Sequence, residues 1–201
     1  MKPALRLVCL LCALAVVPAA HGAGPGPTEQ LRRAIDRVLR VLEDPALKGE
    51  ARAAERRHAL RQIADEIFDF DEMARRAMGQ HWRSLTAAQR TEFVQVFSDL
   101  LERAYTSKIE LYRGEKIQYP GERVEGDLAT VSTRIVTKNG TEVPVDYRTL
   151  RRGDRWRVYD VSIEGVSLVA NYRTQFNSII RTSSYEELLK KMRSRLEETR
   201  P

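Results

Sequence analysis

The chain has 201 residues, of which 31% are charged and 42% hydrophobic, and its formal net charge is +6. Its two cysteines, Cys9 and Cys12, both lie near the N-terminus, so the rest of the chain has no means of disulfide, thiol or zinc–thiolate chemistry. The basic excess is modest and no nucleic-acid-binding motif accompanies it, which argues against a strong nucleic-acid binder.

Residues 1–22 have the pattern of a secretory signal peptide. Lys2 and Arg6 form a short positive region, and an apolar run from Leu7 to Val17 and several small residues follow. This run is shorter than the roughly 18 residues of a membrane-spanning helix. Cleavage after Ala19, Gly22 or Ala23 fits this pattern, so we expect approximately residues 1–22 to be removed on export. Residues 23–201 are then expected to form one domain with a substantial core. Its mildly basic surface is either simply solvated or attracted to anionic lipid or an acidic partner.

The first part of this domain, to about Tyr112, has helical periodicity. Apolar residues recur at spacings of three and four in two segments: Leu31, Ile35, Val38, Leu39 and Leu42, and then Leu60, Ile63, Ala64 and Ile67. A short helix is expected from the acidic segment DFDEM to about Gly79. Thr86 and Gln89 form a capping box that opens a long helix. The buried stripe of that helix is expected to be Phe93, Phe97, Leu100, Leu101, Ala104 and Tyr105.

From Glu115 to Ile163 the apolar period changes to two, which is typical of strands. Asn139-Gly140 predicts a hairpin with a type I′ turn, because that turn needs positive φ at both central residues. Arg152-Gly153-Asp154 predicts a second reversal. The segment therefore predicts an antiparallel meander of about four strands.

The last part of the chain returns to helical periodicity. Val169, Tyr172 and Phe176 share one face, and Ser184 with Glu187 predicts the start of a final helix. Helices, then a meander, then helices predict an α+β fold.

Ser167 raises the question of hydrolase chemistry, because it follows Gly165 between a strand and a helix, as in a nucleophile elbow. The elbow needs a small residue two positions after the serine, and Val169 stands there. No histidine follows His81 in the chain, and the hairpins predict an antiparallel sheet. We interpret Ser167 as a turn residue that helps to cap the following helix.

The other polar candidates also have simple structural interpretations. His58 lies among arginines on a solvated helix face, and His81 lies at a helix end. The acidic residues of DFDEM suit a helix start, where negative charge meets the positive end of the helix dipole. Asp160 and Glu164 lie four residues apart on a strand, with many arginines nearby, so the expected role is a structural salt bridge to an arginine. A glycosidase-like pair is the alternative that the spacing leaves open.

Four long segments resemble the MlaC family. They are FDFDEMARRAMGQHWRSLTAAQRTEFVQVF, YRGEKIQYPGERVEGDLATVSTRI, VPVDYRTL and WRVYDVSIEGVSLVANYRTQFNSIIR, and they cover roughly residues 65 to 190.

The resemblance implies a periplasmic phospholipid carrier, without catalytic residues, cofactor or metal. It implies a curved antiparallel sheet, similar to nuclear-transport-factor-like domains, wrapped by N- and C-terminal helices around an apolar pocket for acyl chains. The implied partners are a diacyl phospholipid, an inner-membrane ABC transporter with an MCE-domain subunit and an outer-membrane lipoprotein–porin complex. The whole of residues 23–201 would then be a single lipid-binding domain.

Pattern alone suggests which side chains would line that pocket. The candidates come from the long helix, the strands and the helix after the turn: Phe97, Leu101, Tyr105, Tyr147, Tyr159, Val161, Ile163, Val166, Val169, Tyr172 and Phe176. Each of these residues fits equally well as an ordinary core residue that contacts no lipid. Two other functions stay open: a carrier of another lipid, such as a hopanoid, and an adaptor of a membrane complex that transports nothing.

Overall fold

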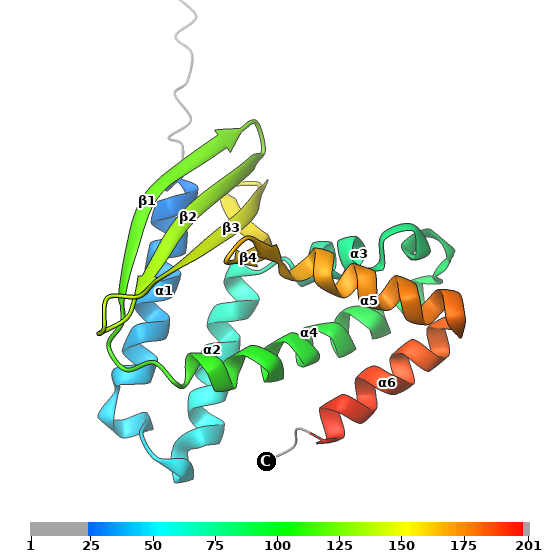
Figure 1. Cartoon of the computed structure of the whole chain (residues 1–201), viewed down its shortest axis with the longest axis horizontal. Coiled ribbons are helices and arrows are strands. Elements are labelled where there is room, and N and C mark those ends of the chain that lie inside the picture. The colour runs from blue at the N-terminus through cyan, green and yellow to red at the C-terminus, as the bar shows by residue number, and fades with distance from the viewer. Residues whose placement is uncertain (1–23, 199–201) are drawn as a thin grey trace, which may run out of the picture.

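The computed structural model describes residues 24–198, so the expected signal peptide lies outside the described residues. Within that range, six α-helices accompany one antiparallel sheet (Figure 1). The α-helices are α1 (Pro27–Glu43), α2 (Ala53–Ile67), α3 (Phe70–Met78), α4 (Ala87–Ile109), α5 (Leu168–Thr182) and α6 (Tyr185–Glu198). The strands are β1 (Lys116–Glu125), β2 (Leu128–Val136), β3 (Glu142–Arg152), β4 (Arg155–Ile163) and β5 (Val166–Ser167). Short 3-10 helices η1 (Pro45–Leu47), η2 (Glu50–Arg52) and η3 (Gly79–Ser84) lie between the helices. This element order confirms the predicted α+β fold.

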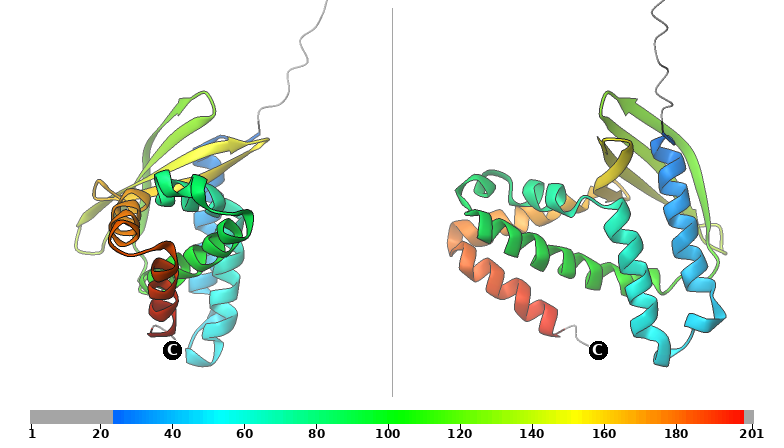
Figure 2. Two further views of the ribbon diagram at one scale, coloured as in Figure 1. Left: turned by 90° about the vertical axis from the view of Figure 1, so that its right-hand side faces the viewer. Right: turned by 180° about the vertical axis from the view of Figure 1, so that it is seen from behind.

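The elements form two adjoining parts (Figures 1 and 2). The sheet and α1 stand together, since α1 packs on β1, β2 and β4, while α3, α4, α5 and α6 pack on one another as a helical layer. The helix α2 contacts α1, β4 and α4, and α5 contacts β4 and β5, so both helices join the two parts.

The helix boundaries follow from local side-chain chemistry. Asp69 accepts a hydrogen bond from the Glu72 N–H at 2.9 Å and caps α3, which ends at Gly79 with a φ of +55°. Thr86 and Gln89 form the predicted reciprocal capping box of α4. These local signals position α4, the longest helix described.

The sheet is an antiparallel meander in the order β1-β2-β3-β4-β5. Its four long strands match the prediction, and the fifth strand has only two residues. Register irregularities occur in β1 between Gln118 and Gly121, and between Arg148 and Thr149 where β3 pairs with β4. Such bulges bend and twist a strand, so they contribute to the curvature of the sheet.

The β2–β3 hairpin forms where predicted, but the predicted turn type is wrong. Thr137 N–H donates to the Thr141 carbonyl at 2.9 Å and Gly140 N–H donates to the Thr137 carbonyl at 3.0 Å, and only Gly140 of the central pair has positive φ. A longer loop that ends in a left-handed glycine lets Asn139 keep an ordinary conformation. Consecutive positive φ values instead occur between β4 and β5, at Glu164 (+50°) and Gly165 (+80°).

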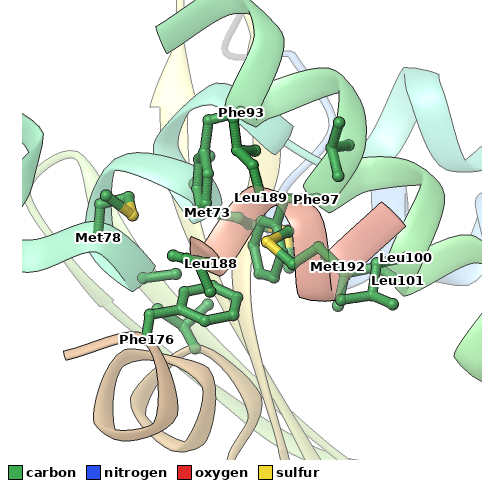
Figure 3. Close-up of a cluster of buried hydrophobic side chains, with 14 of the residues drawn as sticks. Met73, Met78, Phe93, Phe97, Leu100, Leu101, Phe176, Leu188, Leu189 and Met192 are labelled. Atoms are coloured by element: carbon green, nitrogen blue, oxygen red, sulfur yellow. The ribbon is translucent and has the colours of Figure 1, made fainter. Parts of the chain in front are cut away.

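The buried apolar core is divided into two clusters. The first, here called the helical cluster, comprises Met73, Ala74, Ala77, Met78, Leu85, Phe93, Val96, Phe97, Leu100, Leu101, Leu150, Tyr159, Val169, Phe176, Leu188, Leu189 and Met192 (Figure 3). The second, the sheet cluster, comprises Leu31, Val131, Val145, Val158 and Val161. Phe68, partly buried, packs against both clusters.

None of the helices within residues 24–198 combines the length and the apolar character that crossing a bilayer requires.

Candidate functional site

A row of apolar side chains on α4 runs from the closed core toward solvent. Phe93, Phe97, Leu101, Tyr105 and Ile109 stand four residues apart, a spacing that places neighbours on one helix face. The two phenylalanines have no exposed surface, Leu101 is buried, Tyr105 is half-buried and Ile109 is 41% exposed. We call this row the α4 stripe.

The N-terminal half of α5 provides the facing side chains. The ring of Phe176 meets Phe93 edge-on at 5.7 Å between centroids, and Tyr172 meets Phe97 edge-on at 5.2 Å. Tyr105 also interacts electrostatically with Tyr172. Beyond these contacts the two helices diverge toward the sheet (Figure 1), which explains why the side chains at that end of the stripe are less buried.

The strand residues suggested by the sequence do not form one group. Val161 belongs to the sheet cluster, and the half-buried Tyr147 pairs with it in the register and packs on the same cluster. Tyr159 instead joins the helical cluster, where the guanidinium of Arg76 lies 4.0 Å from the centre of its ring. The bulge opposite Arg148 and Thr149 explains the separation, because it breaks the alternation of faces that Tyr159 and Val161 would otherwise share.

The remaining candidates fall into three levels of burial. Phe97, Leu101, Val169 and Phe176 are buried in the helical cluster, and Tyr105 and Tyr172 are half-buried against it. Ile163 and Val166 face each other across the β4–β5 turn and are exposed, at 36% and 62% of their surface. Seven of the eleven predicted residues therefore belong to the helical cluster or pack against it, two lie at the sheet cluster, and two form an exposed aliphatic pair at the turn.

Burial affects the ionisation of the tyrosines in this region. Burial, with a smaller contribution from Tyr172, raises the pKa of Tyr105 to about 12. Burial also raises the pKa of Tyr147 to about 12, and Tyr119 adds to this shift. The hydroxyl groups are therefore neutral at physiological pH, so these aromatic side chains add no charge to the apolar surface.

Ser167 and Asp160 hold the first turn of α5. The Ser167 hydroxyl accepts a hydrogen bond from Ala170 N–H at 3.0 Å and donates to Asp160 Oδ2 at 2.6 Å. Asp160, almost fully buried, also accepts from Val169 N–H at 3.1 Å and lies 3.4 Å from an Arg148 nitrogen. This arrangement confirms the capping role predicted for Ser167, and the contact with Arg148 is the structural salt bridge expected for Asp160.

Sequence reasoning missed Ile109 and Leu168 as members of this region. Leu168 is half-buried against the sheet cluster, and Ile109 extends the α4 stripe by one more turn. The four-residue spacing from Tyr105 pointed to Ile109, but the expected stripe stopped at Tyr105.

Two open surface hollows lie away from these residues. A hollow of about 470 Å³ lies between the start of α1 and β1 and is lined by Gly26, Thr28, Glu29, Arg32, Tyr119, Gly121 and Glu122. A second, of about 370 Å³, is lined by Pro120, Gly121, Ser132, Thr133, Arg134, Pro144 and Asp146. Both hollows include charged side chains in their linings, and none of the predicted residues lines either one.

Comparison with known proteins gives one consistent result. The family model described as MlaC protein matches residues 32–194. The chain is 29% identical over 122 residues to the intermembrane phospholipid transport system binding protein MlaC of Haemophilus influenzae, covering 58% of this chain and 57% of that protein. It is 27% identical over 120 residues to the toluene tolerance protein ttg2D of Pseudomonas putida, covering 59% of this chain and 56% of that protein. The matched region thus spans a little over half the length of these curated relatives.

The fold is also similar to that of a solved structure. The phospholipid-binding protein of Ralstonia solanacearum, determined in complex with a phospholipid, superposes with a TM-score of 0.75 at 26% sequence identity. The match covers 85% of this chain and 96% of that one.

Proposed function

We propose that this chain, which belongs to the MlaC family, is a carrier that binds phospholipid through its acyl chains. The observation that carries the proposal is the α4 stripe with its α5 partners, in a fold similar to that of a protein solved with a phospholipid bound. The stripe offers an apolar surface that continues from a closed core to an exposed end. An acyl chain needs such a surface, since it must enter from outside and still be covered along its length.

The energetics of lipid transfer support binding of this kind. A diacyl lipid has about 30 methylene groups, and each is worth roughly 0.8 kcal/mol when it leaves water. Free passage through water is therefore slow, and a carrier must cover most of this apolar area. Release requires a site about as apolar as a membrane, without strong polar clamps. The candidate residues on α4 and α5 are aromatic and aliphatic, and their hydroxyls are neutral.

The proposed cellular role follows from family membership. The chain would be exported by its N-terminal signal peptide, which is then cleaved, and it would act in the periplasm. There it would move phospholipid between an inner-membrane ABC transporter with an MCE-domain subunit and an outer-membrane lipoprotein–porin complex. The similarity to an intermembrane phospholipid transport system binding protein supports a role between two membranes.

The proposed activity is binding and transfer, not catalysis. Ser167, the side chain that most resembles a nucleophile, is used in capping α5 and in a hydrogen bond to Asp160. A Ser167→Ala variant is therefore expected to carry as much lipid as the parent chain. A hydrolytic activity that disappears with this substitution would contradict the proposal.

The direct test is to identify what the protein carries. The chain would be expressed for export, purified without detergent and extracted with organic solvent, and the extract analysed by mass spectrometry. We expect diacyl phospholipid close to one molecule per chain. A triterpenoid in its place would favour a hopanoid carrier. Absence of any lipid, even after incubation with phospholipid vesicles, would favour the non-transporting adaptor.

A further inference from the structure

The end of α4 and the loop after it form an exposed corner that combines apolar and basic side chains. Ile109 is 41% exposed and Leu111 is 64% exposed. The exposed cations Lys108 and Arg113 stand beside them in the sequence, and Lys116 begins β1. Lys138 of the β2–β3 hairpin is also close, because its side chain lies within 3.9 Å of the position a Cβ of Gly114 would take. We call these six residues the α4 corner: Lys108, Ile109, Leu111, Arg113, Lys116 and Lys138.

None of the four cations of the α4 corner forms a salt bridge within the described part of the chain. Arg113 uses its guanidinium on the backbone carbonyls of Glu110 and Tyr112, and Lys108 lies over the ring of Tyr105. Among the nearby carboxylates, Glu110 is paired with Arg56 at 2.7 Å.

Two further carboxylates lie at this end. Glu115 accepts a hydrogen bond from the Arg113 N–H at 2.7 Å, and Glu43 accepts one from the Tyr112 hydroxyl at 3.3 Å. Backbone hydrogen bonds, and after them the charges of Lys138 and Arg113, lower the pKa of Glu115, so this one carboxylate partly offsets two of the four charges. Because four cations lie near only these two carboxylates, the corner has a net positive charge.

The other end of the sheet provides a contrast. At the β1–β2 hairpin, Val124 and Leu128 are as exposed as Ile109, at 49% and 44%. The cations there are matched: Arg123 pairs with Glu125, and Arg151 pairs with Asp127 at 2.9 Å. Exposed aliphatic side chains thus occur both at the α4 corner and at the β1–β2 hairpin. Of these two places, the α4 corner alone also has a net positive charge.

We infer that the α4 corner contacts the surface of an anionic lipid bilayer. Exposed aliphatic side chains gain by entering the boundary between head groups and acyl chains, and adjacent cations are attracted to anionic head groups. Ile109 belongs both to the corner and to the α4 stripe, so the contact would place the bilayer at the open end of the surface proposed to bind acyl chains. The inference rests on the proposed function and adds to it the surface that meets the membrane.

Vesicle flotation tests the inference with the exported full chain. One set of vesicles contains phosphatidylcholine alone, and the other contains phosphatidylglycerol as well. We expect flotation with the anionic vesicles, weakened by added salt, because exposed charges are screened. Replacing Lys116 and Lys138 by glutamate should weaken it about tenfold or more. The double change Ile109→Ser and Leu111→Ser should weaken it to a similar extent.

The matched control is the double change Val124→Ser and Leu128→Ser, which should alter flotation less than about twofold because this pair lies at the charge-matched end. Equal losses in the control and corner variants, or equal flotation with both vesicle types, would overturn the inference. The inference would also be overturned if the chain never floats and the corner variants impair lipid transfer only to a protein complex.

Lipid extraction from the same samples separates the two proposals. Phospholipid carried by a chain that does not float removes the bilayer contact alone, whereas a chain without lipid removes the proposed function.

Discussion

At the scale of single residues, Asp160 and Ser167 show how one buried carboxylate can fix a helix to a sheet. Asp160 lies on β4, yet its two oxygens take hydrogen bonds from Val169 N–H and the Ser167 hydroxyl at the start of α5. Because α5 carries Tyr172 and Phe176, these bonds set where one side of the candidate site lies relative to the strands.

Removing the Ser167 hydroxyl should lower stability without changing the lipid carried. We expect Ser167→Ala to reduce the free energy of unfolding by about 1 kcal/mol, because an N-cap acceptor is lost. Urea denaturation followed by circular dichroism measures the change. Ser178→Ala, on the exposed side of α5, serves as the control and should change stability by less than about 0.5 kcal/mol. Equal effects at both positions would argue against the cap.

The tyrosines predict how stability depends on alkaline pH. Burial raises the pKa of Tyr105, Tyr119, Tyr147 and Tyr185 to about 12 in the folded chain, whereas an exposed tyrosine has a pKa of about 10. The unfolded chain therefore releases these protons first as pH rises. Their stabilising effect is complete below pH 10 and is lost as the pH rises from 10 through about 12.

Spectrophotometric titration of tyrosinate checks this expectation. We expect part of the tyrosine signal to appear late, together with unfolding, and Tyr147→Phe to remove one late-titrating group. Complete ionisation near pH 10 with the fold intact would contradict it.

At the scale of elements, the α4 stripe predicts a gradient of mutational effects. Phe97→Ala should destabilise the chain by about 3–5 kcal/mol, because it leaves a cavity among Tyr172, Phe176 and Phe93. Ile109→Ala should cost less than about 1 kcal/mol, since the side chain is already partly exposed. Denaturant midpoints of alanine variants along the stripe measure the gradient, and a uniform cost along it would be evidence against the graded burial.

The β4–β5 turn contains a residue in an unfavourable backbone conformation, and replacing that residue should raise stability. Glu164 has a φ of +50°, a left-handed conformation that asparagine and glycine adopt more readily than glutamate. We expect Glu164→Asn to raise the free energy of unfolding by about 0.5–1 kcal/mol. Thermal denaturation measures this change in stability. The control is Glu142→Asn at the start of β3, which makes the same substitution where the backbone is extended. A gain at both positions would show that the turn conformation is not its cause.

The elements also show what the sequence could and could not predict. The starts of α3, α4 and α5 were predictable because Asp69, Thr86 and Ser167 each accept a hydrogen bond from a backbone N–H only three residues away. The bulge that moves Tyr159 to the helical cluster depends on strand pairing, which no local pattern reveals. The exposure of Ile109 depends on the divergence of α4 from α5. Sequence could not predict it, because the helical periodicity of apolar residues is the same in a buried turn and in an exposed turn.

At the scale of the whole molecule, ligand binding should be coupled to stability. A ligand that binds only the folded chain stabilises it by about 2.7 kcal/mol when its free concentration is 100 times the dissociation constant. We expect delipidated protein to melt at a lower temperature than the protein as purified, and added phospholipid vesicles to restore the difference. Calorimetry of both forms checks this. Identical melting curves for lipid-loaded and delipidated samples would mean that the lipid does not contact the folded core.

The division of the core into two clusters has a consequence for how the molecule opens. The sheet cluster and the helical cluster each contain their own fully buried side chains, and the partly buried Phe68 packs on both. Parts of a protein with separate cores exchange their amide hydrogens as separate cooperative units. The amides of β2 would then keep their protection while those at the exposed end of α4 exchange faster. The end of α4 would open locally, while the hydrogen bonds of Asp160 keep the start of α5 on β4.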